Sequence, residues 1–441
     1  MQTQETSSSP LQRSLDMSVA MSEIDREVEA RLRRIARTAK MAGFRPGKVP
    51  FRLIARQYGP QARSEAIGEA VQKAFSAAVQ QRNLRVAGYP RFDRRDGGDA
   101  ENLEFSAVFE VYPDIVLGEV SGCEIERPVL EVGEAEVDRT LEVLRKQRVR
   151  YREAQRSCAA GDRLTIDFHG RIGGEPFQGG DAADFVVVLG SGAMLPDFES
   201  QLAGMAAGDR KSFELRFPDD YHAKDLAGKT AAFEVVVKRI EEAQLPEVDA
   251  DFARALGIAD GDLARMRAEV KANLEREVRK RTRNRIKEQV MDALIAANPI
   301  EVPVALVQEE AHLLAHNAQN DLRQRGLDPK TIGVEPAWFR ATAERRVKLG
   351  LIIAEIVKAR GLAARPEQVR AMVDDFAQSY EDPSEVVRWY YANRQQLAQV
   401  EALVLEENVV DWVLEHARVT DKPVGFDDLM GASGHGELRH E

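Results

Sequence analysis

Residues 163–170 read RLTIDFHG, and the sequence takes on strand periodicity at this stretch. Apolar and polar residues alternate from Leu164 to Phe168, the period of two expected of a half-buried strand. DFVVVLG, KSFELRFP and AAFEVVVKRIEE continue as predicted strands, and paired glycines supply turns between them. LPDFESQLAGM has the pattern of a short amphipathic helix. Residues 158–242 therefore predict a small antiparallel sheet with one helix against it.

The residues before this sheet indicate a small α+β domain. RSLDMSVA at 13–20 alternates like a strand, and Ser22 is the predicted N-cap of the helix that follows. A second helix is predicted over about 61–81. Strands return at about 86–93 and 103–113, joined by the polar turn RRDGGDAEN. The two helices should therefore carry a loop between them.

The residues after the sheet are almost entirely helical in pattern. From Leu245 onward there is little strand signal, and the helices have broad polar faces and few aromatic residues. This predicts a multidomain α+β protein whose last domain is an extended helical body. The expected parts are residues 1–113, a linker at 114–149 with a helix packed on the helical body, the sheet domain at 150–243, the helical domain at 244–430 and a disordered tail at 431–441.

The charge of the chain points away from a general nucleic-acid binder. The formal net charge is −11 over 441 residues, which is rare in that class. One window, residues 31–64, nevertheless lacks Asp and Glu. Its basic residues are Arg31, Arg33, Arg34, Arg37, Lys40, Arg45, Lys48, Arg52, Arg56 and Arg63. A local cationic surface on an acidic protein predicts one anionic docking partner.

Other sequence features predict a cytoplasmic protein without a bound metal or cofactor. Neither Cys123 nor Cys158 has metal-ligand spacing, and no disulfide is expected. His312 and His316 are spaced like a zinc-binding pair, but no third ligand completes a site, so a surface pair is expected. The N-terminus lacks the pattern of a signal peptide, and no apolar run approaches ~18 residues.

The cationic window contains the loop AGFRPGKVPFR at residues 42–52. It is not a phosphate-binding loop of the Walker type, because its glycines are one residue too close and Val49 replaces Ser or Thr. Phe44 is flanked by glycine, Arg45 could grip an anion bidentately, and Lys48 adds a point charge. The loop is therefore a candidate docking hook, with an ordinary helix-to-helix connection as the alternative.

Aromatic residues of the sheet segment stand at strand ends, in loops and on the short helix, where a buried core alone also explains them. From TIDFHGRIGGEPFQGG to AAFEVVVKRIEE, the order of the segment resembles the FKBP-type peptidyl-prolyl isomerase family. The resemblance implies an apolar catalytic pocket with no cofactor. The implied pocket residues are Phe168, Phe177, Phe185, Met194, Leu195, Phe198, Tyr221 and Phe233.

The family pattern also assigns roles within that pocket. It implies that the Tyr221 hydroxyl and the Leu195 backbone N–H steady a substrate carbonyl. Two positions depart from the pattern. Gln178 stands where the family usually has Asp, and Phe198 stands where it usually has Trp. The departures leave catalysis in place with an altered sequence preference.

The loop GFRPGKVP resembles the ribosome-docking signature G-F-R-x-G-K-x-P of the trigger factor family. Further matches are FEVYPDIVL, ANPIEVPVALV, RRVKLGLIIAEIVK and YEDPSEV. The resemblance implies docking near the tunnel exit of the large ribosomal subunit, on protein and RNA, by Gly43, Phe44, Arg45, Gly47 and Lys48. It also implies binding of nascent and unfolded polypeptides, protein folding and export, and a weak homodimer off the ribosome.

Two further expectations follow from the residues themselves, independently of this resemblance. No intact nucleotide motif is present, which predicts ATP independence. Apolar residues scattered among charges in the helical body would suit loose client binding, although helix contacts explain them equally well. These residues include Met266, Leu274, Leu313, Leu314, Met372 and Phe376.

Two other functions remain open at this point. One is a free isomerase whose other domains only recruit substrates. The other is a holdase or scaffold whose pocket is inactive, a reading that the departures at Gln178 and Phe198 allow.

Overall fold

The computed structural model describes most of the chain, which divides into two compact units. The described residues are 10–42, 44, 48–95, 101–221, 223–378, 380 and 382–431. Unit 1 comprises residues 1–127 and 284–422, and unit 2 comprises residues 128–283 and 423–441. Of the tail predicted to be disordered, residues 432–441 lie outside the described part. Within it, no helix combines the length and apolar content needed to cross a membrane.

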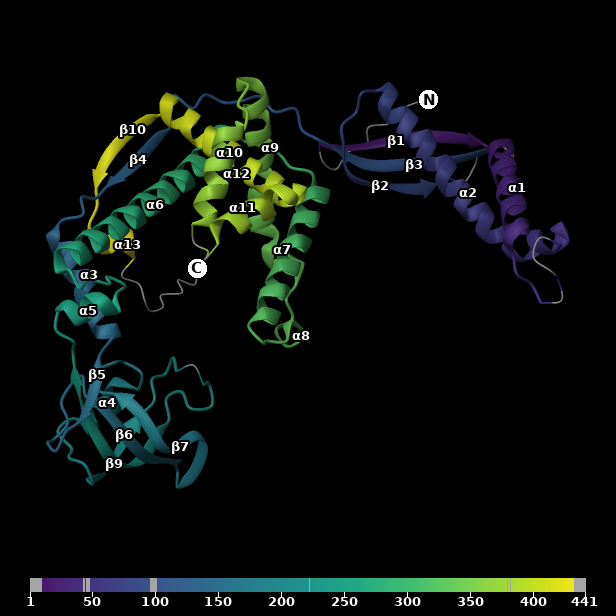
Figure 1. The fold of residues 1–441 in the computed structure, drawn as a ribbon. Helices are drawn as coiled ribbons and strands as arrows, with labels where there is room; N and C mark the ends of the chain where they lie inside the picture. Colours follow the sequence, from purple (N-terminus) through teal and green to yellow (C-terminus); the bar gives the residue numbers. More distant parts are fainter. Residues whose placement is uncertain are drawn as a thin grey trace. The chain divides into compact units, whose positions relative to one another are not determined.

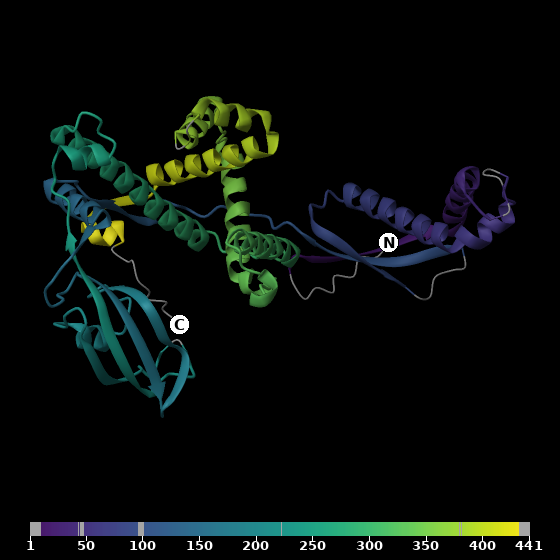
Figure 2. The same ribbon diagram turned by 60° about the horizontal axis from the view of Figure 1, so that its bottom comes forward.

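Unit 1 begins with a three-stranded antiparallel sheet in the order β1-β3-β2. Its strands are β1 (Gln12–Ala20), β2 (Val86–Arg94) and β3 (Asn102–Val111). The second half of helix α2 (Phe51–Gln81) packs on this sheet, with Phe75 edge-on to Phe109 at 5.1 Å between ring centroids (Figures 1 and 2). The alternating residues of β1 are buried in this core, as the sequence predicts.

Helices α1 (Met21–Thr38) and α2 form a hairpin whose ends differ from the sequence expectation. The prediction that Ser22 caps α1 is wrong. The Met21 N–H instead donates to the Glu101 carbonyl at 2.8 Å, so the strand connection supplies the cap. Helix α2 begins ten residues earlier than expected and contains Pro60. Pro60 is exposed, so water can reach the carbonyl that the missing N–H leaves unpaired.

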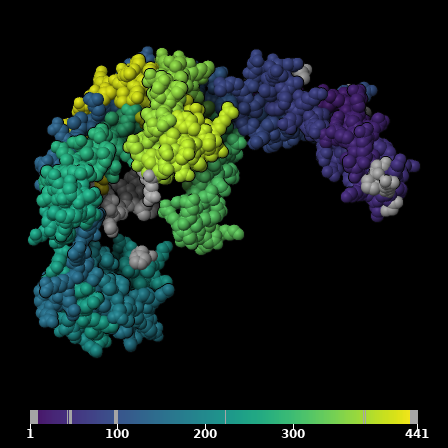
Figure 3. Space-filling view, in the orientation of Figure 1, coloured from purple at the N-terminus to yellow at the C-terminus, as the bar shows by residue number. Residues whose placement is uncertain are grey.

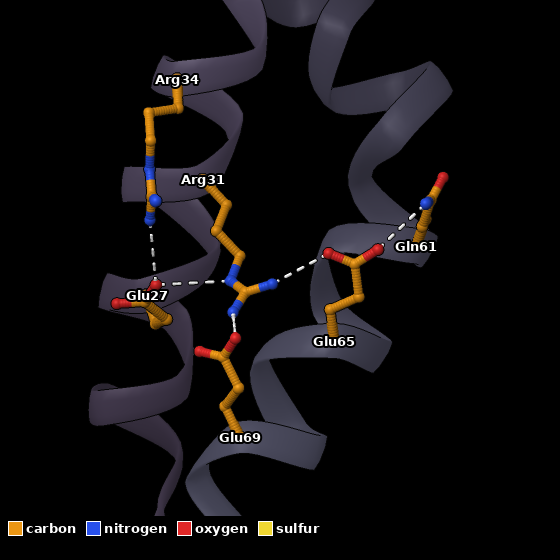
Figure 4. A network of polar contacts seen from close by, with 6 residues as sticks. All are labelled: Glu27, Arg31, Arg34, Gln61, Glu65 and Glu69. Atoms are coloured by element: carbon orange, nitrogen blue, oxygen red, sulfur yellow. Dashed lines mark hydrogen bonds and ion pairs between the residues drawn. The ribbon is translucent and has the colours of Figure 1, made fainter. Parts of the chain in front are cut away.

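Arg31 holds the two helices of this hairpin together (Figure 4). Its guanidinium contacts Glu27 on its own helix at 3.3 Å, and Glu65 of α2 at 2.9 Å, and it also pairs with Glu69 of α2. The hydrogen bond from Arg31 lowers the pKa of the Glu69 carboxyl. Gln61 donates to Glu65 at 3.0 Å and extends the network along α2. This Arg31 brace ties α1 to the middle of α2 and so holds the two helices that flank the connecting loop side by side.

The remainder of unit 1 is a helical body. Its helices are the end of α6 (Leu263–Ala297), α7 (Val304–Gln324), α8 (Pro329–Ile332), the 3-10 helix η1 (Pro336–Phe339), α9 (Arg340–Arg360), α10 (Pro366–Ala377), α11 (Pro383–Ala392) and α12 (Arg394–His416). Val290, Ile352 and Val410 are fully buried where α6, α9 and α12 meet. The structure adds a strand that the sequence pattern did not indicate, β10 (Arg418–Pro423), which pairs with β4 (Glu124–Val129).

Unit 2 contains the predicted sheet, with strand order β5-β9-β6-β7 and β8 paired to β9. It appears in Figure 2 as a twisted sheet, and in Figure 3 as the rounded teal-blue body. The strands are β5 (Arg150–Glu153), β6 (Arg163–Ile172), β7 (Glu175–Val188), β8 (Arg210–Arg216) and β9 (Thr230–Gln244). One short helix, α4 (Pro196–Leu202), covers a face of the sheet, so the multidomain α+β fold is confirmed.

A second core in unit 2 is helical. Helix α3 (Glu134–Gln147) buries Val137 and Leu141 against α5 (Ala250–Ala255) and the first half of α6. The short α13 (Phe426–Met430) also contacts this core. Met266 and Leu274 are buried here, so for these two residues the structure supports the alternative of helix contacts. Of the other apolar residues named for the helical body, Leu313 is exposed, whereas Leu314, Met372 and Phe376 are partly buried.

Candidate active site and docking surface

The sheet of unit 2 holds a cavity of about 640 Å³ beside α4. All eight residues predicted for the pocket line it: Phe168, Phe177, Phe185, Met194, Leu195, Phe198, Tyr221 and Phe233. They come from β6, β7, the loop before α4, α4 itself, the loop after β8, and β9. The fold therefore brings together side chains that are up to 65 positions apart, since Phe168 and Phe233 lie at the two extremes. Their catalytic roles stay a prediction.

Phe198 forms the floor of this cavity. It is 2% exposed and stands edge-on to Phe168 and Phe233, with centroid distances of 5.9 and 5.3 Å. Phe185 is 37% exposed and lies at the rim, edge-on to Phe168 at 5.7 Å. Such edge-to-face contacts favour one arrangement of the rings. The floor is consequently rigid and dry, and the rim is open to an incoming chain.

The sequence reasoning missed Phe217 as a cavity residue. It follows β8, alternates inward like an ordinary core residue, and lines the cavity beside Tyr221, with a centroid distance of 4.9 Å. Leu215 and Leu226 also line the cavity. Gln178, which departs from the family pattern, is a lining residue and adds a side-chain amide to the cavity wall. The only sequence signal for Phe217 was its place at a strand end.

His169 and Asp167 lie on β6 but do not act on the cavity. His169 contacts Asp181 at 3.1 Å, and its side chain is 61% exposed. Asp167 accepts the Asp184 backbone N–H at 2.7 Å, and Lys238 lies 2.9 Å away. These two contacts, the backbone hydrogen bond first, lower the pKa of Asp167. Both residues belong to an exposed polar face of the sheet, as expected from the alternation.

Gly170 is the position where a side chain would disturb the cavity most directly. A methyl group there would lie 2.6 Å from Cε1 of Phe233 and 3.0 Å from Cε1 of Phe177. We expect Gly170→Ala to displace both rings, to destabilise the domain by about 1–3 kcal/mol, and to lower kcat/KM for X-Pro isomerisation about tenfold. A peptide isomerisation assay and thermal unfolding measure both effects. His169→Ala, on the same strand and facing solvent, should leave kcat/KM unchanged; an equal loss there would contradict the explanation.

The second candidate surface is the end of the α1–α2 hairpin. Of the predicted docking residues, Gly43, Arg45 and Gly47 lie outside the described part of the chain, whereas Phe44 and Lys48 lie within it. Phe44 is 40% exposed, and its N–H donates to the Met41 carbonyl at 3.1 Å. An aromatic ring is therefore presented to solvent rather than buried in the hairpin core.

The hairpin divides its cations into two groups. Arg31, Arg33, Arg34 and Arg63 pair with acidic residues of α1 or α2. This corrects the prediction that all basic residues of the window form one free cationic surface. Among the described residues of the window, those that are exposed and form no ion pair are Arg37, Lys40, Lys48, Arg52 and Arg56. The unneutralised charge is thus concentrated beside the connecting loop.

The part of the chain that the structure describes contains no recognisable metal-binding site. No group of three or more His, Cys, Asp or Glu side chains there is arranged to hold a metal ion. His312 lines a separate cavity of about 480 Å³ between α7, η1 and α9. Cys123 and Cys158 are both free thiols in the structure.

Comparison with known protein families identifies the family of the domain that contains the cavity. Residues 154–238 match the family described as FKBP-type peptidyl-prolyl cis-trans isomerase. The sheet domain of unit 2 is therefore an isomerase of X-Pro bonds. Residues 1–144 match the family described as bacterial trigger factor protein, and residues 262–415 match its C-terminal family.

Full-length relatives agree with these matches. The trigger factor of Aromatoleum aromaticum is 59% identical and covers 98% of this chain and 99% of its own. Those of Azoarcus sp. and Dechloromonas aromatica are 57% and 52% identical, over 97% and 96% of this chain and 98% and 97% of theirs. The chain belongs to the trigger factor family, chaperones that have peptidyl-prolyl isomerase activity.

Proposed function

We propose that the protein docks on the large ribosomal subunit, near the tunnel exit, through the loop between α1 and α2. There it binds nascent and unfolded chains without ATP and isomerises their X-Pro bonds. The observation that carries the docking proposal is the exposed Phe44 beside unpaired cations, including Lys48 and Arg52. Phosphates of structured RNA and acidic protein side chains both fit such a surface. Gly43, Arg45 and Gly47 complete the proposed loop.

The isomerase cavity acts on the same chains by a mechanism without bond cleavage. Rotation about an X-Pro bond has a barrier of ~18–20 kcal/mol because the amide must lose its resonance. The apolar floor around Phe198 desolvates the substrate carbonyl, which favours the twisted amide over the planar one. In the proposed roles, the Tyr221 hydroxyl and the Leu195 N–H orient that carbonyl. Acceleration of a step that takes tens of seconds or more unaided would help folding.

Several further points belong to the same proposal. The functional domains have their boundaries near residues 113, 149, 243 and 430, with the segment from 114 to 149 as linker. The protein works in the cytoplasm, contributes to folding and export, and forms a weak homodimer when it is off the ribosome. Docking through a few cations should weaken steeply as the salt concentration rises. It should also be weak enough for the protein to bind and leave ribosomes repeatedly.

Site-specific crosslinking tests the docking proposal directly. A photoreactive residue placed at Lys48 of the intact protein should crosslink to large-subunit components when ribosomes are added. The matched control is Lys73, an exposed lysine on the part of α2 beyond the brace, whose amine lies 3.5 Å from Glu23. Crosslinking from position 48 with little from 73 supports the proposal. Equal crosslinking from both positions, or none from 48, contradicts it.

A further inference from the structure

Glu199 is a buried carboxylate directly beside the cavity floor. It follows Phe198 on α4 and is 7% exposed. Its Oε2 accepts the Gly190 N–H at 2.7 Å, and its Oε1 accepts the Met194 N–H at 3.2 Å. A buried carboxylate is costly unless its oxygens find donors, and here each oxygen has one. The two donors stand at the two ends of one loop.

That loop forms part of the cavity wall. Gly192, Ala193, Met194 and Leu195 all line the cavity. The loop departs from regular structure, since Gly190 has φ +86° and Gly192 has φ +73°. The other hydrogen bonds of the loop N–H groups do not reach a side chain of α4: the Ser191 N–H donates to the Val188 carbonyl at 3.2 Å, and the Ala193 N–H donates to Ser191 Oγ at 3.4 Å. The Glu199 carboxylate is therefore the group that fixes both ends of the loop to α4.

We propose that Glu199 is a positioning residue for X-Pro isomerisation. It does not touch the substrate; it holds the loop at residues 190–194 so that Met194 and Leu195 keep their places in the cavity wall. Because α4 carries Phe198 as well, Glu199 locks floor and wall into one rigid unit. Without the two hydrogen bonds to Glu199, the loop can move relative to Phe198. Small displacements of the groups in an active site lower the reaction rate by large factors.

A purely structural role is the competing explanation, and the domain supplies a matched control. Glu241 is also 7% exposed, but its carboxylate lies 2.8 Å from Arg163 and 3.5 Å from Arg239, and neither arginine lines the cavity. Replacing either glutamate with glutamine keeps the size of the side chain and removes a buried charge. Only Glu199 should affect the wall of the cavity.

The experiment compares Glu199→Gln and Glu241→Gln in the full-length protein. Glutamine keeps one acceptor oxygen, so one of the two loop amides loses its partner. We expect Glu199→Gln to lower kcat/KM for an X-Pro peptide about tenfold and to speed hydrogen exchange in the loop 190–194. Glu241→Gln should leave both unchanged even if it lowers the melting temperature. Should Glu199→Gln fail to fold, Glu199→Asp keeps the charge but is too short to reach both amides, and the same result is expected.

A double-mutant cycle with Met194→Ala tests whether the effect passes through the loop. If Glu199 acts by holding this loop, the losses in kcat/KM from the two substitutions should be less than additive. Unchanged kcat/KM in the folded Glu199 variants would overturn the proposal. Fully additive losses would also overturn it, because they would show that Glu199 and Met194 act independently. Equal losses in Glu241→Gln would overturn it as well, because they would show that stability and not loop position governs the rate.

Discussion

Replacing Phe198 with alanine is expected to lower kcat/KM for X-Pro isomerisation about a hundredfold. The ring is the floor of the cavity, and Phe168 and Phe233 both make edge-to-face contacts with it. Its loss opens a void that water can enter and lets those two rings tilt from their positions. Desolvation of the substrate carbonyl and support for the twisted amide are then lost together. The rate of cis-to-trans exchange in a short X-Pro peptide measures the effect.

The same substitution destabilises the domain, so its effect on rate needs a control that removes a neighbouring, partly buried ring from outside the cavity. Removing a buried phenylalanine side chain costs about 3–5 kcal/mol. Phe213 packs on Phe198 at 5.4 Å and on Phe233 at 6.1 Å, yet it does not line the cavity. Phe213→Ala, assayed well below its melting temperature, should keep most of the activity. Full activity in folded Phe198→Ala would mean that the cavity floor is not where isomerisation occurs.

Local periodicity was enough to predict the sheet of unit 2. Strands β6, β8 and β9 follow the alternation of apolar and polar residues, because one face of each is buried and the other meets water. The eight pocket residues were predicted from the order of the segment, and the structure brings them to one cavity. Phe217 was missed because its inward side chain follows the same alternation as the core, and only the fold of the next loop opens it to the cavity.

Features that depend on distant partners could not be predicted in this way. Strand β10 pairs with β4, which lies almost 300 residues earlier in the chain, so no local sequence pattern indicates this pairing. The acid-free window looked uniformly cationic, but the acids that neutralise part of it lie just outside, at Glu27, Glu65 and Glu69. Helix geometry places Glu27 one turn from Arg31, whereas Glu65 and Glu69 reach Arg31 only because α2 packs against α1.

The buried apolar residues of α6 show the same limit. Met266 and Leu274 stand among charged residues in sequence, a pattern that suits either exposure or a helix contact. Their partners, Val137 and Leu141, belong to a segment that precedes the whole sheet domain in the chain. Which residues of a long helix are buried is decided by a partner that is distant in sequence.

The central claim, that the hairpin loop docks the protein on ribosomes, is tested most directly by ribosome co-sedimentation of a loop variant. The variant Phe44→Ala/Arg45→Ala/Lys48→Ala removes the exposed ring and two cations, and leaves the Arg31 brace intact. We expect it to bind ribosomes at least about tenfold more weakly than wild type, and the salt slope of binding to fall by about two.

The control variant, Arg33→Ala/Arg34→Ala, removes two cations that are already paired with Glu29 and Glu27. It should pellet with ribosomes like the wild type. Wild type and control should pellet with ribosomes at low salt, both should be released at moderate salt, and the folded loop variant should stay in the supernatant. If the loop variant pellets as well as the wild type, the loop is only a connection between helices and the docking claim is wrong.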